Sequence, residues 1–281
     1  MAKKIIVSAP ARIDLSSGWP DSPPYRDDFG GSVLNVAINK RVKVTFDKAR
    51  GRFTIDDDEV LDCHGLGASG ARDSAELVAR EKRNLDDRFK LIKNVWDLQN
   101  VNVGHRGGCQ DQAAAIFGGG NLWYFGPGKI ENMEILRTEI PRKFLEPLEK
   151  RLVLVNTGEP HFSSNVHDSV FGGENYSRNI PALKRMSKIA VEMSGCLTDD
   201  DKIGRLISES WELQKALHLS IETDAMRELQ EKYKGKYLAC KALGAGGGGF
   251  FMFYTTKPKE FSDVAVPFKF DYQGIKIREY D

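Results

Sequence analysis

Features that mark disulfide-stapled, zinc-binding or membrane-spanning proteins are scarce in this sequence. Its 4 cysteines lie far apart without a Cys-x-x-Cys pair, and no histidine is spaced to complete a zinc site. We therefore expect buried, reduced thiols. No apolar run reaches the roughly 18–20 residues that span a bilayer, and the apolar stretch after the first lysines is too short for a signal peptide. These absences favour a cytoplasmic protein.

An excess of charge of either sign is absent as well. The chain carries 41 Lys+Arg against 40 Asp+Glu, which gives a formal net charge of +1. This balance excludes strong general attraction to nucleic acid or to an anionic membrane, although it allows a local basic site for a phosphorylated ligand. The 11 prolines mark no linker, and no internal repeat is visible. We expect small-molecule partners, and a monomer or homodimer.

The composition that is present, 41% hydrophobic and 29% charged residues in 281, is that of an ordinary soluble globular protein. At about 100–200 residues per domain, this length predicts one large domain or two lobes that share a core. Runs typical of strands dominate the first half, at Ile5–Ser8, Val33–Ile38, Val42–Phe46, Arg52–Ile55 and Asn121–Phe125. Helical spacing dominates the second half, at Ile180–Met193, Ile203–Leu217 and Asp224–Tyr233, beside strands at Arg151–Asn156 and Phe250–Tyr254. The order predicts an α+β fold with lobes at 1–150 and 151–281.

Two further helix signals concern boundaries and exposure. Thr198 followed by Asp201 resembles a capping box and predicts that a helix begins there. Between Ser74 and Gln99, apolar residues recur at approximate helical spacing in a polar stretch. This pattern predicts one or two surface helices.

A run of glycines, Gly244–Gly249, stands before the last apolar strand. A dinucleotide-binding fingerprint follows a strand and opens a helix, and here the order is helix, glycines, strand, which argues against it. A purely structural turn is one interpretation, although five glycines make a flexible turn. The favoured interpretation is that the glycines let backbone N–H groups approach a bound anion or substrate.

Three passages in fixed order resemble the GHMP kinases, the superfamily of galactokinase, homoserine kinase, mevalonate kinase and phosphomevalonate kinase. They are PARIDLSSGWPDSPPY (Pro10–Tyr25), GGCQDQAAAIFGG (Gly107–Gly119) and KALGAGGGGFFMFY (Lys241–Tyr254). The opening motif and QDQ are most similar to the sugar-1-kinase branch, which contains D-glycero-D-manno-heptose 7-phosphate kinases and fucokinases. LVLVNTGEPHFSSNVH (Leu152–His167) and WELQKAL (Trp211–Leu217) also resemble this branch.

The resemblance implies a two-lobed GHMP kinase fold, with an N-terminal lobe like domain 2 of ribosomal protein S5 and the site in the cleft between the lobes. The implied activity is ATP- and Mg2+-dependent transfer of the γ-phosphoryl group to a sugar hydroxyl. The anomeric C1 hydroxyl is the expected acceptor, and the substrate is a heptose 7-phosphate or a free hexose such as fucose.

The resemblance also implies catalytic roles for Asp111 and Arg12. Asp111 matches the family's acidic residue beside the sugar hydroxyl, where a carboxylate can orient the hydroxyl and accept its proton. The alternative is a loop aspartate that caps the next helix. Arg12 is expected to pair with Asp111 or to stabilise charge on the transferring phosphoryl group. The alternative for Arg12 is a structural ion pair at the end of a strand.

The substrate side of the site looks intact. Asp21 matches the residue that holds sugar hydroxyls, as an acceptor-only group can. Trp19 either stacks on a sugar face or fills the lobe interface. His161 and His167 are candidate substrate contacts, with exposed or capping histidines as the alternative. The residues expected to bind substrate are Asp14, Ser17, Trp19, Asp21, Gly108, Gln110, Gly246 and Gly247.

The nucleotide side departs from the family. Its phosphate cradle, PxxxGLGSSxA, is matched only by HGLGASGAR (His64–Arg72), which lacks the proline and one serine. Ser69 is the expected Mg2+ ligand, with a helix cap as the alternative. The stretch Arg52–Cys63 is too short for the helix and strand expected there, and Asp97 is the nearest substitute for the family's magnesium-binding glutamate. The residues expected to bind nucleotide are Gly65, Gly67, Ala68, Ser69 and Gly70.

These departures leave three accounts open. The cradle is divergent but functional, the phosphoryl donor differs, or the protein binds a sugar or sugar phosphate without phosphorylating it. An active kinase is favoured. Nucleotide affinity distinguishes it from a binding protein that has lost the nucleotide.

Overall fold

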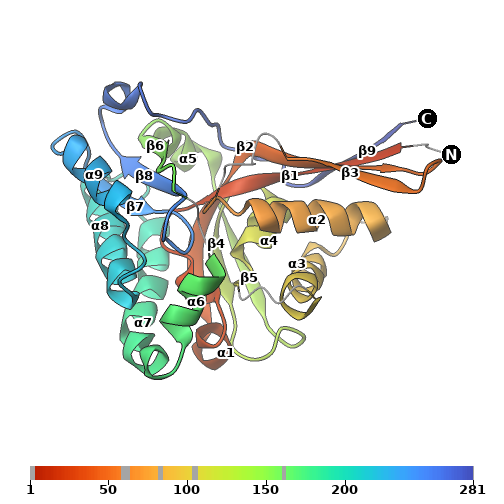
Figure 1. Cartoon of the computed structure of the whole chain (residues 1–281), viewed down its shortest axis with the longest axis horizontal. Coiled ribbons are helices and arrows are strands. Elements are labelled where there is room, and N and C mark those ends of the chain that lie inside the picture. The colour runs from red at the N-terminus through yellow and green to blue at the C-terminus, as the bar shows by residue number, and fades with distance from the viewer. Residues whose placement is uncertain (1–3, 58–63, 82–84, 103–106, 160–162, 281) are drawn as a thin grey trace.

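A computed structural model gives the fold and describes residues 4–57, 64–81, 85–102, 107–159 and 163–280. Figure 1 shows two sheets, each covered by its own group of helices. The element order is α+β, as the sequence predicts. Cys109, Cys196 and Cys240 are buried free thiols, which confirms that expectation for them, and Cys63 lies outside the described residues.

The first sheet has the strand order β5-β4-β2-β1-β9, with β3 paired to β2. Every pairing in it is antiparallel. Its strands are β1 (Lys4–Asp14), β2 (Gly31–Asp47), β3 (Arg52–Asp56), β4 (Gly120–Phe125), β5 (Ile135–Ile140) and β9 (Lys276–Tyr280). One face is covered by α2 (Ala68–Glu81), α3 (Arg88–Asp97) and α4 (Gln110–Phe117) (Figure 1).

Strand β2 is one strand of 17 residues, where the sequence predicts two. The prediction divided it at the polar residues between Ile38 and Arg41. The pairing with β1 shifts register at Pro10/Ala11, so Pro10 faces Arg41 while Ala11 faces Ile38. Because a bulge absorbs the two extra residues and proline has no N–H to lose, the strand continues through the irregularity.

Helix α2 packs on β1 and β2 and is not a surface helix. Its buried side is made of small residues, Ala71, Ala75 and Ala79, together with Val78. The three alanines recur every four residues, which places them on one face of the helix. Because alanine contributes little to average hydrophobicity, the polar composition of this stretch conceals a buried face.

The second sheet has the order β6-β8-β7 and is antiparallel throughout. Its strands are β6 (Leu152–Asn156), β7 (Ala239–Ala242) and β8 (Phe250–Tyr254). The chain also forms α1 (Tyr25–Phe29), α5 (Arg142–Glu149), α6 (Ser163–Phe171), α7 (Glu174–Ser194), α8 (Asp200–Leu217) and α9 (Asp224–Lys232), with short turns of helix at Trp19–Asp21, Leu98–Asn102 and Pro258–Phe261. Helix α8 is capped by Asp199, whose side chain accepts from the Lys202 N–H, so the predicted capping box at Thr198 is wrong by one residue.

The last strand returns to the first sheet. The second sheet begins at Leu152, close to the expected lobe boundary, whereas β9 pairs with β1 and brings the C-terminal segment beside the N-terminus. Figure 1 shows both ends on the same side of the molecule. Within the described residues, no helix is long and apolar enough to cross a membrane.

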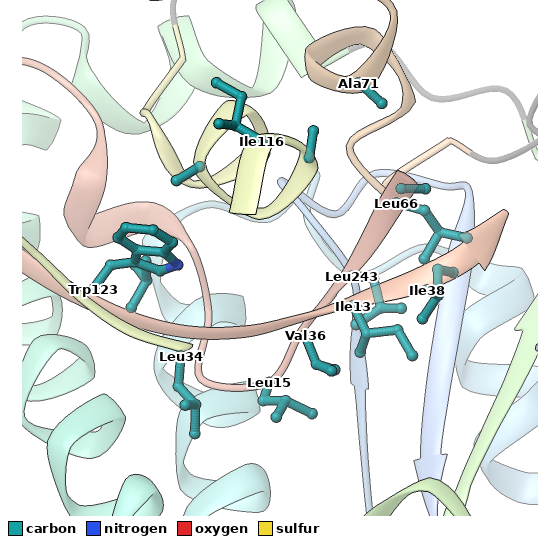
Figure 2. Packing of buried hydrophobic residues seen from close by; sticks show 14 of the residues in the cluster. Ile13, Leu15, Leu34, Val36, Ile38, Leu66, Ala71, Ile116, Trp123 and Leu243 are labelled. Carbon is teal, nitrogen blue, oxygen red and sulfur yellow. The ribbon is translucent and has the colours of Figure 1, made fainter. Parts of the chain in front are cut away.

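The core joins the segments that carry the motifs. Ile13 from β1, Leu66 from the turn before α2 and Leu243 from the end of β7 are fully buried in one cluster. Figure 2 shows these three side chains close together beside Ile38 of β2. Burying such side chains stabilises the fold by roughly 1.5–3 kcal/mol each. The three motif loops therefore start from one packed anchor.

Candidate active site

A cavity of about 420 Å3 lies between the two lobes. Its wall comes from the first strand and following turn, the turn before α2, the start of α4, helix α6 and the glycine-rich loop. Of the residues predicted for the site, the wall contains Arg12, Trp19, Asp21, Gly65, Gly67, Ala68, Ser69, Gly108, Gln110 and Asp111. It does not include Asp14, Ser17, Gly70, Gly246 or Gly247, which lie behind or beside it.

Asp111 and Arg12 form an ion pair in this wall. Arg12 Nε and Nη2 lie 2.8 and 2.7 Å from the same oxygen, Asp111 Oδ1, so Oδ2 takes no part in this contact. The Arg12 side chain is buried, while that of Asp111 is 28% exposed. Asp111 stands in the first turn of α4, where the helix dipole favours a negative charge. The arrangement holds a carboxylate at the cavity surface in a fixed orientation.

The turn before α2 packs directly on this pair. Arg12 Nη1 donates to the Gly65 carbonyl at 2.5 Å, and the Arg12 N–H donates to the Leu66 carbonyl at 2.8 Å. A Cβ on Gly70 would lie 2.5 Å from Asp111 Cβ. Only glycine allows this approach, which brings the N-terminus of α2 against the catalytic candidates. The unpaired N–H groups of that helix end form a site suited to a phosphate.

Gly67→Ala tests whether this turn must keep its shape. Gly67 has a φ of +71°, and a Cβ there would lie 3.1 Å from both Arg12 Cγ and Asp111 Cγ. We expect the turn to shift and the dissociation constant for Mg·ATP, measured by calorimetry, to rise about tenfold or more. Gly51→Ala is the matched control, because Gly51 also has a positive φ of +60° but nothing within 4 Å. An unchanged nucleotide affinity in Gly67→Ala would contradict the cradle.

Asp21 is fully buried at the cavity wall. The Gln110 N–H donates to its Oδ2 at 2.7 Å, and a Cβ on Gly108 would lie 2.0 Å from the carboxylate. Burial raises the pKa of Asp21 to about 7, against the hydrogen bond from Gln110, and the nearby Asp111 charge adds to the rise. Asp21 can therefore change its charge near neutral pH.

We expect this titration to be visible in sugar binding. The ionised carboxylate accepts hydroxyl protons better than the protonated one, so kcat/KM for the sugar should fall below pH 7. The free energy of unfolding changes with pH in the opposite direction. The folded state binds the Asp21 proton more tightly than the unfolded chain, so this group's contribution to the free energy of unfolding is lost as pH rises from 3.8 to about 7. Asp21→Asn should remove both dependences, and a pH profile identical to that of the wild type would refute the assignment.

Asp14 lies behind the cavity rather than in its wall. Its carboxylate Oδ2 is 3.5 Å from Lys241 Nζ, and Nζ also donates to the Asp14 carbonyl at 3.0 Å. Both side chains are completely buried. Burial lowers the pKa of Lys241, while the Asp14 charge opposes that change. The pair joins β1 of the first lobe to β7 of the second.

Ser17, three residues after Asp14, occupies a strained backbone position. Its φ is +80°, unlike any other described non-glycine residue, and its buried Oγ has no hydrogen-bond partner. Such strain concentrates at functional sites. Ser17 shapes the turn that carries Trp19 and Asp21 into the cavity wall.

The residues of the cavity wall fit a magnesium ion bound mainly to the nucleotide phosphates better than one held by protein ligands alone. Among the described residues, no group of three His, Cys, Asp or Glu side chains could hold a metal. Ser69 is in the wall at the N-terminus of α2, and magnesium commonly binds through one or two protein oxygens plus phosphates. In the segment where the GHMP kinases carry a magnesium-binding glutamate, the residue that reaches the wall is Gln99 and not Asp97. The Gln99 side chain donates to Asp73 at 2.6 Å and accepts from Gln112 at 2.5 Å.

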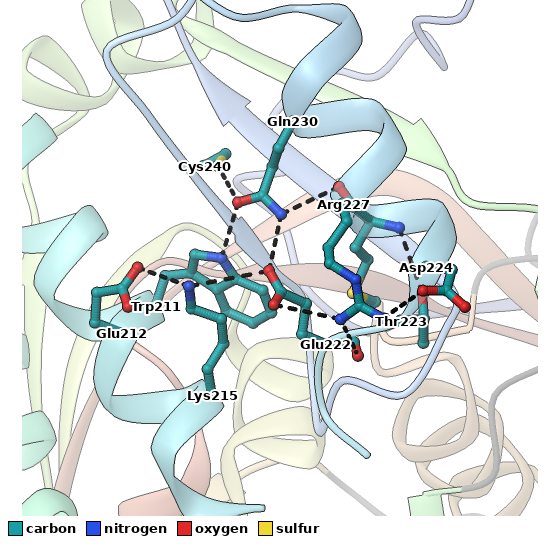
Figure 3. Close-up of polar contacts among 10 residues, drawn as sticks. Trp211, Glu212, Lys215, Glu222, Thr223, Asp224, Arg227, Gln230 and Cys240 are labelled. Carbon is teal, nitrogen blue, oxygen red and sulfur yellow. Dashed lines mark hydrogen bonds and ion pairs between the residues drawn. The ribbon is translucent and has the colours of Figure 1, made fainter. Parts of the chain in front are cut away.

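The glycine-rich loop is held from behind. The Gln214 side chain donates to the Gly244 carbonyl at 3.0 Å, and the Gly247 N–H donates to the Ile221 carbonyl at 2.9 Å. Next to Ile221, Glu222 accepts from Gln230 at 2.9 Å. Figure 3 shows Glu222 at the centre of a polar cluster whose other members come from α8, α9 and β7. This cluster fixes the loop on which Gly246 and Gly247 pack.

Sequence reasoning missed several wall residues and could have found some of them. Gln112 belongs to QDQ and Ala245 to the glycine run, so both motifs signalled them. His64 and Arg72, which also line the cavity, are the two ends of the cradle match HGLGASGAR, whereas Gln99 and Asn100 line it without a local signal. His167 is in the wall, whereas His161 lies outside the described residues.

Comparisons with known proteins bear on this geometry. No family model matches the chain. The D-glycero-alpha-D-manno-heptose 7-phosphate kinase of Campylobacter jejuni is 24% identical over 340 residues, covering 98% of each chain. The bifunctional fucokinase/GDP-fucose pyrophosphorylase of Arabidopsis thaliana is 24% identical over 87% of this chain and 29% of its own length. A solved D-glycero-D-manno-heptose 1-phosphate kinase from Bacteroides thetaiotaomicron superposes with a TM-score of 0.74 at 19% identity, covering 99% of both chains.

The two lobes, the motif-lined cleft and the structural likeness over nearly the full chain define a GHMP kinase fold. In sequence the chain is similar to the sugar kinase branch of the GHMP kinases, with its heptose 7-phosphate kinases and fucokinases. The 340-residue alignment exceeds this chain's 281 residues, so the Campylobacter protein contains stretches that this chain lacks.

Proposed function

We propose that the protein is a sugar kinase that transfers the γ-phosphoryl group of ATP to the anomeric C1 hydroxyl of a sugar. The observation that carries the proposal is the Arg12–Asp111 pair, held in the cavity wall against the glycine turn at the N-terminus of α2. A carboxylate and a phosphate-binding helix end face one space there. This is the juxtaposition that phosphoryl transfer to a hydroxyl requires.

The proposed reaction needs no covalent intermediate. The C1 hydroxyl oxygen forms a bond to the γ-phosphorus while the bond from that phosphorus to the bridging oxygen breaks, and ADP leaves with the electron pair. Asp111 accepts the hydroxyl proton. Arg12 fixes the Asp111 carboxylate, and the amides at the start of α2 hold the phosphates. Positioning and charge stabilisation supply the rate.

Magnesium, with Ser69 as its candidate protein ligand, would neutralise part of the charge on the nucleotide phosphates. Gly65, Gly67, Ala68 and Gly70 would shape the backbone around them. Asp21 and Gln110 would contact sugar hydroxyls, and Gly246 and Gly247 would support the loop between the two substrates. Asp14 would pair with Lys241 and so join the two lobes, rather than touch the sugar.

Thermal-shift titration of the full chain with Mg·ATP, Mg·ADP and a panel of sugars tests the proposal. Ligands that bind only the native state stabilise it, by about 2.7 kcal/mol at a concentration of 100 Kd. We expect a shift from the nucleotides and from at least one sugar. A sugar shift with none from any nucleotide would instead support a non-catalytic sugar-binding protein, and the kinase proposal would fail.

A further inference from the structure

A second cavity of about 140 Å3 adjoins the substrate end of the first. His167 of α6 belongs to the walls of both cavities, so this one side chain separates them. The second wall is completed by Pro23, Pro24, Asp168, Phe171 and Gly172. A ligand held near Trp19 therefore has further space beyond His167.

The partition between the cavities is aromatic. The His167 ring centroid lies 4.8 Å from that of Trp19 in the main cavity and 5.5 Å from that of Phe171 in the second. Trp19 is buried, yet its indole Nε1 has no hydrogen-bond partner. Buried N–H donors are nearly always paired, so this one is suited to an oxygen of a bound ligand. Aromatic faces of this kind also suit the apolar face of a sugar ring.

The described carboxylates at this end outnumber the described lysines and arginines. Asp21 lies in the wall of the main cavity and Asp168 in that of the second. Among the described wall residues, the lysines and arginines number two. Arg12 is paired with Asp111, and Arg72 lies on α2, 3.8 Å from Asp73. A phosphate group carries a charge of about −1.5 to −2 at neutral pH and needs cationic partners.

We infer that the acceptor is an uncharged sugar whose far hydroxyl groups lie against His167 and Asp168, and that a phosphate at that end is rejected. The inference rests on the proposed function for the reacting end of the sugar, and it adds the chemistry of the opposite end. Asp168, and Asp21 above about pH 7 where it is ionised, accept hydrogen bonds from sugar hydroxyls, Trp19 Nε1 donates to a sugar oxygen, and the ionised carboxylates repel an anion. The protein thereby differs in substrate from a kinase of sugar phosphates.

Calorimetric binding without nucleotide tests this directly. The probes are D-mannose against D-mannose 6-phosphate, D-glycero-D-manno-heptose against its 7-phosphate, and L-fucose. We expect at least one free sugar to bind, and each phosphate to bind at least tenfold more weakly than its parent. Equal or tighter binding of a phosphate, or binding of none of the five compounds, would overturn the inference. Failure of the proposed function would appear separately, as a sugar that binds but receives no phosphoryl group from ATP.

Two variants and a control test which residues distinguish a free sugar from its phosphate. Asp168→Lys replaces an exposed carboxylate of the second cavity by a cation, and should improve binding of the phosphorylated sugars at least tenfold relative to the free ones. Asp263→Lys, on an exposed site paired with Lys232, is the control for the same charge change and should leave the ratio unaltered. His167→Ala should weaken binding of the free sugar at least tenfold while the affinity for Mg·ATP stays constant. If Asp168→Lys leaves the affinity ratio of free to phosphorylated sugar unaltered, the far end of the sugar does not lie against Asp168.

Discussion

Asp111→Asn should lower turnover by a factor of about 100 to 10,000, the range expected for loss of a general base. The asparagine has nearly the shape of aspartate, and its carbonyl oxygen can still accept from Arg12 Nε and Nη2, which both contact Oδ1 in the wild type. What the substitution removes is the ability to take the hydroxyl proton. The KM for sugar and the affinity for Mg·ATP should therefore change little, so the loss should lie in kcat.

Steady-state kinetics with sugar and ATP varied separately measure this split. Asp200→Asn is the matched control, since Asp200 is also a partly exposed aspartate in the first turn of a helix, paired with Arg151 and outside the cavity wall. It should retain wild-type turnover. Near-normal kcat in Asp111→Asn would rule out Asp111 as the base.

Lys241→Met should lower the free energy of unfolding by about 3–5 kcal/mol, the cost of leaving one partner of a buried ion pair uncompensated. The substitution would leave the fully buried Asp14 carboxylate without the cation that offsets its charge: its two oxygens have no hydrogen bond, and among the described residues its ion-pair partner is Lys241, with Nζ 3.5 Å away. The methionine keeps most of the apolar stem, so lost packing contributes little. Chemical denaturation at constant pH measures the effect.

The double variant Lys241→Met/Asp14→Asn provides the decisive comparison. Removing the orphaned charge should restore more than half of the lost stability, a coupling that independent sites do not show. Lys232→Met is the control for a surface lysine, since its pair with Asp263 is exposed and screened by solvent, and the substitution should leave stability nearly unchanged. If the double variant were as unstable as the sum of its parts, the buried pair would not be the source of the effect.

The motifs allowed much of the candidate site to be predicted because they are local. The opening motif, QDQ and the glycine run each bring several wall residues within a few positions of one another, so Arg12, Asp21 and Asp111 could be proposed together. The contact between Arg12 and Asp111 spans 99 residues and rests on the family resemblance rather than on any spacing. The fold class followed from the order of strand and helix patterns.

The parts that could not be predicted depend on distant partners. Lys241 and Asp14 are 227 residues apart, and only the pairing of lobes shows that both are buried. A lysine inside the buried strand Ala239–Ala242 was nevertheless a signal, since such a charge needs a partner. Strand β9 is mostly exposed and polar, so it lacks the alternation that reveals a strand, and its place beside β1 is set by tertiary pairing. Helix α6, which carries His167, follows a segment without strong periodicity.

Transfer of a phosphoryl group from ATP to a sugar can be followed with radiolabelled nucleotide. The full chain is incubated with Mg2+, γ-³²P-labelled ATP and the free sugar that binds most tightly. We expect the wild type to form a sugar phosphate labelled on C1, and Asp111→Asn to form almost none. If the protein binds both Mg·ATP and the sugar yet transfers no label, it is not a sugar kinase.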